Sequence, residues 1–255
     1  MGLDLHLTDG NLAVLKEVWP LCRAARGSFF GDLNVTPGER VPEVTGSFHI
    51  KDGRLDLFSY APRVRQVNAE ILLKNDLARV EHARARVGSG WIEMAGDIGI
   101  NGLSPVEYDL SIESDGSRGV AVEVPQLSVP PGPLLGHFSF FSEKLKGISY
   151  GEPQVSLRVK GLHGQHLISG TALLEETHFT YPPDKEGFHG IPGPSWWRNF
   201  WRQAAWDIRF KTGKETWYRN EYVNVRLDGG LHLAGQPGAW TVNGRVGSTE
   251  GAINY

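Results

Sequence analysis

The sequence predicts an all-β fold of repeating antiparallel strands with two short helices, in which the apolar face of the sheet must be covered in a sandwich or barrel or must curl into a curved groove. Apolar and polar residues alternate with a period of two over most of the chain, as they do along half-buried strands. The 255 residues include 32 glycines and 15 prolines, which punctuate turns between short elements. A fourteen-residue pattern also recurs, which indicates a repeated structural unit.

Composition excludes several classes of function. A net charge of −3 gives no general attraction to nucleic acid. The single cysteine, Cys22, excludes an internal disulfide and a thiol–metal cluster. No apolar run reaches the roughly 18 residues of a membrane span, and the first ten residues lack the basic start of a signal peptide. Because residues 251–255 stop within an alternating pattern, we expect a piece of a longer protein.

The elements follow from local patterns. Leu12, Leu15, Val18 and Trp19 share one helical face, so a helix is predicted over 11–25, bent at Pro20. A second helix is predicted over 195–205, with Ser195 as N-cap. Strands are predicted at 44–50, 54–57, 67–73, 91–100, 108–112, 120–124, 155–159, 206–210 and 222–233. This gives a lead-in over 1–26 and a β-groove region over 27–255, with a Trp-rich helical insert at about 182–206.

Three fourteen-residue stretches align without gaps. They read VTGSFHIKDGRLDL, ISGTALLEETHFTY and VNGRVGSTEGAINY, and begin at Val44, Ile168 and Val242. Each has a glycine at its third position, and shorter copies of the pattern contain Gly96 and Gly229. A turn is expected in the middle of each stretch, most clearly at Asp52-Gly53, where an Asp-Gly pair between alternating runs favours a hairpin.

These repeats resemble the C-terminal region of the TamB proteins, within the AsmA-like group of bacterial envelope proteins. The strongest stretch is 216–255, with its WYRNE entry at 217–221 and its closing GAINY at 251–255. The segment 27–100 has the same character, especially at 42–46 and 52–57. The motifs record turn chemistry and alternation and contain no reactive groups.

The resemblance implies a taco-shaped β groove with an apolar interior, in a protein anchored in the inner membrane and facing the periplasm. It implies phospholipid transport between the two membranes, or assistance in outer-membrane protein assembly. The implied partners are phospholipid or another acyl-chain ligand, a TamA-like barrel and nascent outer-membrane β-strands.

Alternation predicts which side chains line such a groove, because successive side chains point to opposite faces of a sheet. An acyl chain of about fourteen carbons costs on the order of 10 kcal/mol when it is pulled into water, so a carrier must offer continuous apolar contact. The predicted lining residues are Phe48, Ile50, Leu55, Leu57, Ile168, Leu174, Phe179, Tyr181, Val242, Val246, Ile253 and Tyr255.

Other interpretations stay open. The same positions would form the core of a closed β protein. The predicted second helix places Trp197, Phe200 and Trp201 on one face, either as a cap on the β core or as an interfacial helix. Exposed tryptophans would also suit a carbohydrate-binding β-solenoid, and the whole could be a purely structural scaffold.

The sequence contains no motif of an enzyme or of a cofactor site. His163, His166, His178 and His189 are the densest group of histidines, but a zinc site needs three or four ligands with a supporting second shell. Glu175 and Glu176 read as solvated turn residues. We therefore predict no catalytic residues, no metal and no cofactor.

Overall fold

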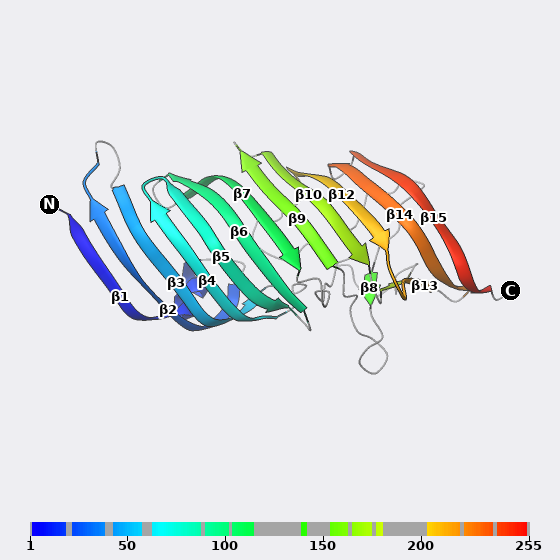
Figure 1. Cartoon of the computed structure of the whole chain (residues 1–255), viewed down its shortest axis with the longest axis horizontal. Coiled ribbons are helices and arrows are strands. Elements are labelled where there is room, and N and C mark those ends of the chain that lie inside the picture. Colours follow the sequence, from blue (N-terminus) through cyan, green and yellow to red (C-terminus); the bar gives the residue numbers. More distant parts are fainter. Residues whose placement is uncertain are drawn as a thin grey trace.

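The computed structural model describes residues 2–18, 22–38, 43–57, 63–87, 90–101, 104–114, 139–141, 154–162, 165–174, 177–180, 203–219, 222–236 and 239–253. The strands of this part of the chain belong to one sheet (Figure 1). They are β1 Leu3–Asn11, β2 Cys22–Thr36, β3 Glu43–Leu57, β4 Val64–Lys74, β5 Leu77–Val87, β6 Gly90–Asn101, β7 Ser104–Ser114, β8 Ser139–Phe141, β9 Gln154–Leu162, β10 Gln165–Leu174, β11 His178–Thr180, β12 Ala204–Thr212, β13 Trp217–Arg219, β14 Val223–Gln236 and β15 Ala239–Ile253. The prediction of an all-β fold is confirmed.

Strand order follows the chain for most of the sheet. Neighbours from β1 through β7 to β9 and β10 pair antiparallel, and so do β12, β14 and β15. Two pairs are parallel, β10 with β12 and β11 with β13. The predicted antiparallel pairing is found between most neighbours and is wrong for these two pairs, in which β10 runs parallel to β12 and β11 to β13.

The junction between these parallel strands is held by two buried threonines. Thr177 and Thr216 have 0% exposure. The Thr216 hydroxyl donates to the carbonyl oxygen of Leu174 at 2.6 Å, and the Trp217 amide donates to the carbonyl oxygen of Thr177 at 2.7 Å. These bonds satisfy backbone groups where β10 and β12 end and the short strands β11 and β13 begin.

The repeat identified in the sequence has a structural basis in its glycines. Gly46, Gly96, Gly170, Gly229 and Gly244 all have φ between +137° and +145°. A Cβ on Gly170 would lie 2.1 Å from the carbonyl oxygen of Ser156 on the neighbouring strand, and the other four meet a neighbouring carbonyl at 1.9–2.2 Å. Only glycine fits this backbone, and regularly placed glycine kinks bend a sheet.

The Asp52-Gly53 dipeptide forms a bulge within a continuous strand. Asp52 has φ +50°, and the pairing register of β3 with β4 shifts between Ile50 and Gly53. The predicted hairpin turn is therefore wrong. The extra residue lets the apolar positions change from even to odd numbers, so that Phe48 and Leu55 stay on one face.

The N-terminal helix is shorter than predicted. It comprises the 3₁₀ turn η1 (Leu12–Val14) and α1 (Leu15–Val18), capped by the Asn11 side chain, which accepts from the Ala13 amide at 2.9 Å. From Cys22 the chain is a strand, since its pairing with β3 outweighs the local helical pattern. The predicted lead-in thus contains β1 and belongs to the sheet. In the second predicted helix, residues 204–205 begin β12, and 195–202 lie outside the described residues.

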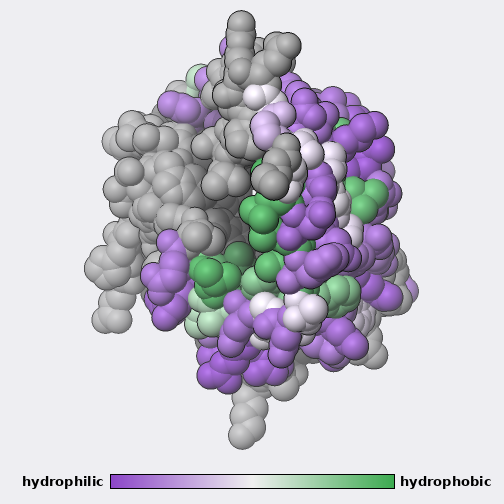
Figure 2. Space-filling model, turned by 90° about the vertical axis from the view of Figure 1, so that its left-hand side faces the viewer, coloured by the Kyte–Doolittle hydropathy of each residue, from purple (hydrophilic) through white to green (hydrophobic). Residues whose placement is uncertain are grey.

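Two clusters of buried residues lie on the apolar side of the sheet. In the first, Leu12 of η1 is 1% exposed and packs against Cys22 and Ala25 of β2. In the second, Ile168, Ala204 and Ile208 meet across β10 and β12. Seen from its N-terminal end, the molecule is hollowed, with hydrophobic side chains in the recess and hydrophilic side chains on the outer surface (Figure 2).

Candidate functional site: the apolar face of the sheet

One face of the sheet carries an unbroken row of apolar or glycine positions. Residues that pair directly across strands point to the same face, so the register identifies the row from β1 to β15. Its members are Leu7, Gly31, Phe48, Ile71, Val80, Gly96, Leu110, Val159, Ile168, Trp206, Gly235 and Trp240. Twelve strands lie side by side along this row, and at about 4.8 Å per strand its eleven steps span roughly 50 Å.

The predicted lining residues of the first repeat lie on this face. Phe48, Ile50 and Leu55 are half-buried. The Phe48 ring packs 5.0 Å from that of Phe29. Ile50 and Leu55 pack against the cluster of Leu12, so the short helix covers one end of the face and leaves Phe48 beyond it.

In the second repeat the predicted residues belong to the packed core. Ile168 and Leu174 lie on the apolar face, opposite Trp206 and Thr212, but they are only 6% and 5% exposed. They support the face and do not form its accessible lining.

In the third repeat the predicted residues lie on the edge strand. Val242 pairs with Leu233, Val246 with Gly229, and Ile253 with Val223. Val242 and Ile253 are 58% and 59% exposed. β15 pairs only with β14 among the described strands, so this end of the apolar face is open.

The remaining candidates cannot be compared with side-chain positions. Leu57 and Phe179 belong to β3 and β11, but their side chains lie outside the described residues. The other candidates outside the described part of the chain are Tyr181, Tyr255, Trp197, Phe200 and Trp201.

The apolar face contains a polar pair that the sequence did not predict. The Tyr108 ring covers Gly161 and stacks on His166, with ring centroids 6.0 Å apart, and a hydrogen bond of 2.7 Å joins its hydroxyl to His166 Nδ1. Burial raises the pKa of Tyr108 and lowers the pKa of His166. Burial therefore favours the neutral form of both side chains. Alternation in the sequence was sufficient to place the Tyr108 side chain on the apolar face. That His166 is its partner follows only from the pairing register of the sheet.

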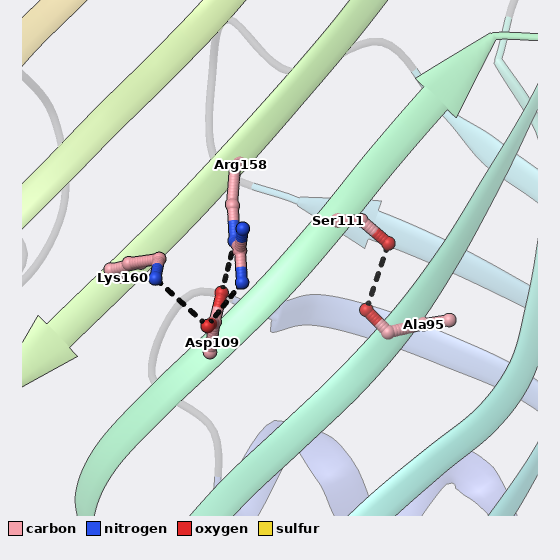
Figure 3. Close-up of polar contacts among 5 residues, drawn as sticks. All are labelled: Ala95, Asp109, Ser111, Arg158 and Lys160. Atoms are coloured by element: carbon pink, nitrogen blue, oxygen red, sulfur yellow. Dashed lines mark hydrogen bonds and ion pairs between the residues drawn. The ribbon is translucent and has the colours of Figure 1, made fainter.

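The opposite face carries charged pairs that cross between strands. Arg158 donates to Asp109 through Nε and Nη2, both at 2.6 Å, and Lys160 lies 3.1 Å from the same carboxylate (Figure 3). These bonds lower the pKa of Asp109 to about 2. Arg79 and Asp97 form a similar pair at 2.8 Å. This face is thus suited to contact with solvent.

No three His, Cys, Asp or Glu side chains cluster as metal ligands in the described part of the chain. None of the helices described there is long and apolar enough to cross a bilayer. Trp217, one of the tryptophans considered for sugar binding, donates through its indole to Glu215 at 2.9 Å. What the described residues bring together is therefore an extended apolar surface.

No family model, curated protein or solved structure matches this chain.

Proposed function

We propose that the apolar face binds the acyl chains of phospholipids, and that this chain is a periplasm-facing groove segment of a TamB-like envelope protein. The parent protein would be anchored in the inner membrane and would conduct phospholipid between the membranes, or assist outer-membrane protein assembly with a barrel partner. The observation that carries the proposal is the unbroken apolar row from Leu7 to Trp240 on one face of a single sheet.

The dimensions and energetics of the row suit this ligand. A length of roughly 50 Å exceeds the hydrocarbon core of a bilayer, about 30 Å. Each CH₂ group withdrawn from water contributes about 0.8 kcal/mol. Because every step along the row offers an apolar or glycine position, an acyl chain can move along it without being exposed to water. Such a carrier needs no site specific for one headgroup.

Burial differs along the row. Val80 and Ile168 are 4% and 6% exposed, whereas Phe48 and Ile71, which pair across β3 and β4, are both half-buried. Half-burial at Phe48 and Ile71 favours an open face there, because the centre of a closed sandwich buries such side chains fully. At the C-terminal edge, Leu231 and Val246 are 38% exposed.

Two adjacent residues of β4 allow a matched test. Ile71 lies on the apolar face between Phe48 and Val80, whereas Leu72 lies on the opposite face between Ser47 and Arg79 and is 37% exposed. Native mass spectrometry of protein purified from a bacterial envelope should detect bound phospholipid. Ile71→Asp should abolish binding, and Leu72→Asp should leave it unchanged.

A second measurement covers the case in which Ile71→Asp does not fold. A photoreactive side chain at position 71 should cross-link to phospholipid, whereas the same group at position 72 should not. Protein free of lipid in both experiments would contradict the proposal and leave a closed core or a plain scaffold as the explanation.

Strand capture is a second candidate, favoured by the edge of β15. This strand has fifteen residues, is exposed over nearly its whole length and pairs only with β14 among the described strands. An unpaired edge can accept a further strand by β-augmentation. A peptide with the sequence of an outer-membrane strand should then slow hydrogen exchange in β15. Unchanged exchange there would contradict capture at this edge.

A further inference from the structure

A group of arginines gathers on the polar face of the sheet, on the side opposite the apolar row. Arg26 on β2 lies directly opposite Arg54 on β3. Arg65 on β4 lies directly opposite Arg86 on β5. Their neighbours Ala25, Leu55, Val64 and Val87 point to the apolar face, so the four guanidinium groups share the other one. We call Arg26, Arg54, Arg65 and Arg86 the arginine cluster.

The arginine cluster borders a shallow cavity of about 440 Å³. Its wall consists of Asp52, Gly53, Arg54, Arg65, Gln66 and Arg86. Three cluster arginines against one carboxylate leave an excess of positive charge. The volume lies within the range of small-molecule sites.

The backbone on two sides of the cavity is irregular. Asp52 and Gln66 are non-glycine residues with φ of +50° and +52°. The register shifts beside both of them, at Ile50/Gly53 on β3 and at Arg65/Asn68 on β4. Bulges turn side chains away from the direction of a regular strand and are frequent beside binding sites. Strained backbone of this kind persists where the surrounding structure or a ligand holds it.

The arginine cluster lacks counter-ions within the described part of the chain. None of its four members forms a salt bridge or a side-chain hydrogen bond there. Arginines that face an acid on the same side of the sheet do pair, such as Arg79 with Asp97 at 2.8 Å. Like charges placed directly opposite each other destabilise a sheet. An anion bound between them removes that repulsion.

We propose that the arginine cluster and its cavity bind a phosphate group, either a soluble phosphate ester or the phosphate of a lipid headgroup. The planar guanidinium fork donates two parallel hydrogen bonds to phosphate oxygens. A phosphate monoester carries three unesterified oxygens and up to two negative charges, and the phosphodiester of a phospholipid carries two such oxygens and one charge. In both, the oxygens are arranged tetrahedrally around phosphorus, so guanidinium groups from neighbouring strands can approach the same phosphate from different directions. The cavity also leaves room for part of the esterified alcohol.

The test uses two double variants that remove the same charge. Arg54→Gln with Arg65→Gln alters the cavity wall, whereas Arg79→Gln with Arg158→Gln removes two arginines already paired with Asp97 and Asp109. Binding of inorganic phosphate and of glycerol 3-phosphate is measured by calorimetry. Binding to phosphatidylcholine vesicles, with and without phosphatidylglycerol, is measured by flotation.

We call Arg54→Gln with Arg65→Gln the cavity variant and Arg79→Gln with Arg158→Gln the paired variant. A soluble ligand is supported if the wild type binds the soluble phosphates, the cavity variant binds them at least about tenfold more weakly, and the paired variant binds them less than about twofold more weakly. Flotation only with phosphatidylglycerol, lost in the cavity variant alone, supports a lipid headgroup. Absence of both, or equal loss in the two variants, overturns the proposal. If the cavity variant does not fold, the single change Arg86→Gln replaces it. Lipid bound to the apolar face is unaffected by these changes, so the proposed function is tested separately.

Discussion

Tyr108 and His166, 58 residues apart in the chain, stack with their rings inclined by only 6° and join through a hydrogen bond of 2.7 Å. Both residues pair with Gly161, Tyr108 from β7 and His166 from β10. A Cβ on Gly161 would lie 2.3 Å from the Tyr108 ring. The glycine thus makes space for an aromatic side chain that covers its backbone and places a polar pair on the apolar face.

This pair predicts a pH dependence of stability. Burial lowers the pKa of His166 below 6.5, its ordinary value. The unfolded chain takes up a proton as the pH falls below about 6.5, and the folded chain resists it. The stability linked to this group is therefore full above that pH and is lost as the pH falls. The urea midpoint is measured from pH 7.5 down to pH 5.5, a range of about one unit on either side of the ordinary His pKa. As the pH is lowered, the midpoint should fall more steeply for the wild type than for His166→Gln. Identical slopes would contradict this interpretation.

The glycines of the repeat predict a position-specific cost of alanine. Gly170→Ala should lower the free energy of unfolding by on the order of 2–3 kcal/mol, because alanine is strained at φ +139° and its Cβ meets the Ser156 carbonyl. Gly247→Ala is the control, since the nearest atom to a Cβ there lies at 4.0 Å. It should leave the urea midpoint unchanged or slightly raised. Equal effects in the two variants would show that the repeat glycine is not required.

The Thr216 hydroxyl predicts a cost at the junction of the parallel strands. Thr216→Val keeps the shape of the side chain but removes its 2.6 Å bond to the buried Leu174 carbonyl, which keeps its 2.7 Å bond from the Gly213 amide. The free energy of unfolding should fall by about 1 kcal/mol. In Thr241→Val, an exposed hydroxyl that donates to the Ala234 carbonyl at 3.1 Å is lost instead. The change there should stay within about 0.5 kcal/mol, and a similar loss at both sites would argue against the buried bond.

Asp109 predicts a second pH effect, at acid pH. The hydrogen bonds from Arg158 lower the pKa of Asp109 to about 2. A depressed carboxyl pKa contributes stability above the unfolded pKa, about 4, and this stability disappears as the pH falls to about 2. The contribution should not exceed about 1 kcal/mol, because the Asp109 side chain is 39% exposed. Chemical denaturation of Asp109→Asn should lack this step, whereas Arg158→Gln should show a smaller one, because Lys160 still lies 3.1 Å from the carboxylate. A step retained in full in either variant would assign it to another group.

Much of the site follows from the sequence because a strand alternates its side chains between two faces. That rule places Phe48 and Ile50 on one side of β3, and Leu55 shares that side because the bulge at Asp52 shifts the alternation. It does not distinguish lining from core, because Ile168 and Val242 obey the same alternation with 6% and 58% exposure. Their burial depends on which strand lies at the centre of the sheet and which at its edge.

The limits of local patterns are clearest at Asp52 and in the segment that follows α1. An Asp-Gly pair suits a two-residue hairpin and a bulge equally well, since both use a residue with positive φ. Residues 22–25 fit a helical pattern, but they pair with β3 over a strand of fifteen residues. Long-range pairing decided both cases.

The sequence by itself determined the all-β class, the two unlike faces and the glycine repeat, because these depend on residue type and spacing along a single strand. Only the tertiary structure decided the parallel pair β10–β12, the stacking of Tyr108 on His166 and the gathering of the arginine cluster. The physical reason is that register and strand order bring together residues far apart in the chain, and the free energy of that pairing is not encoded in any one segment.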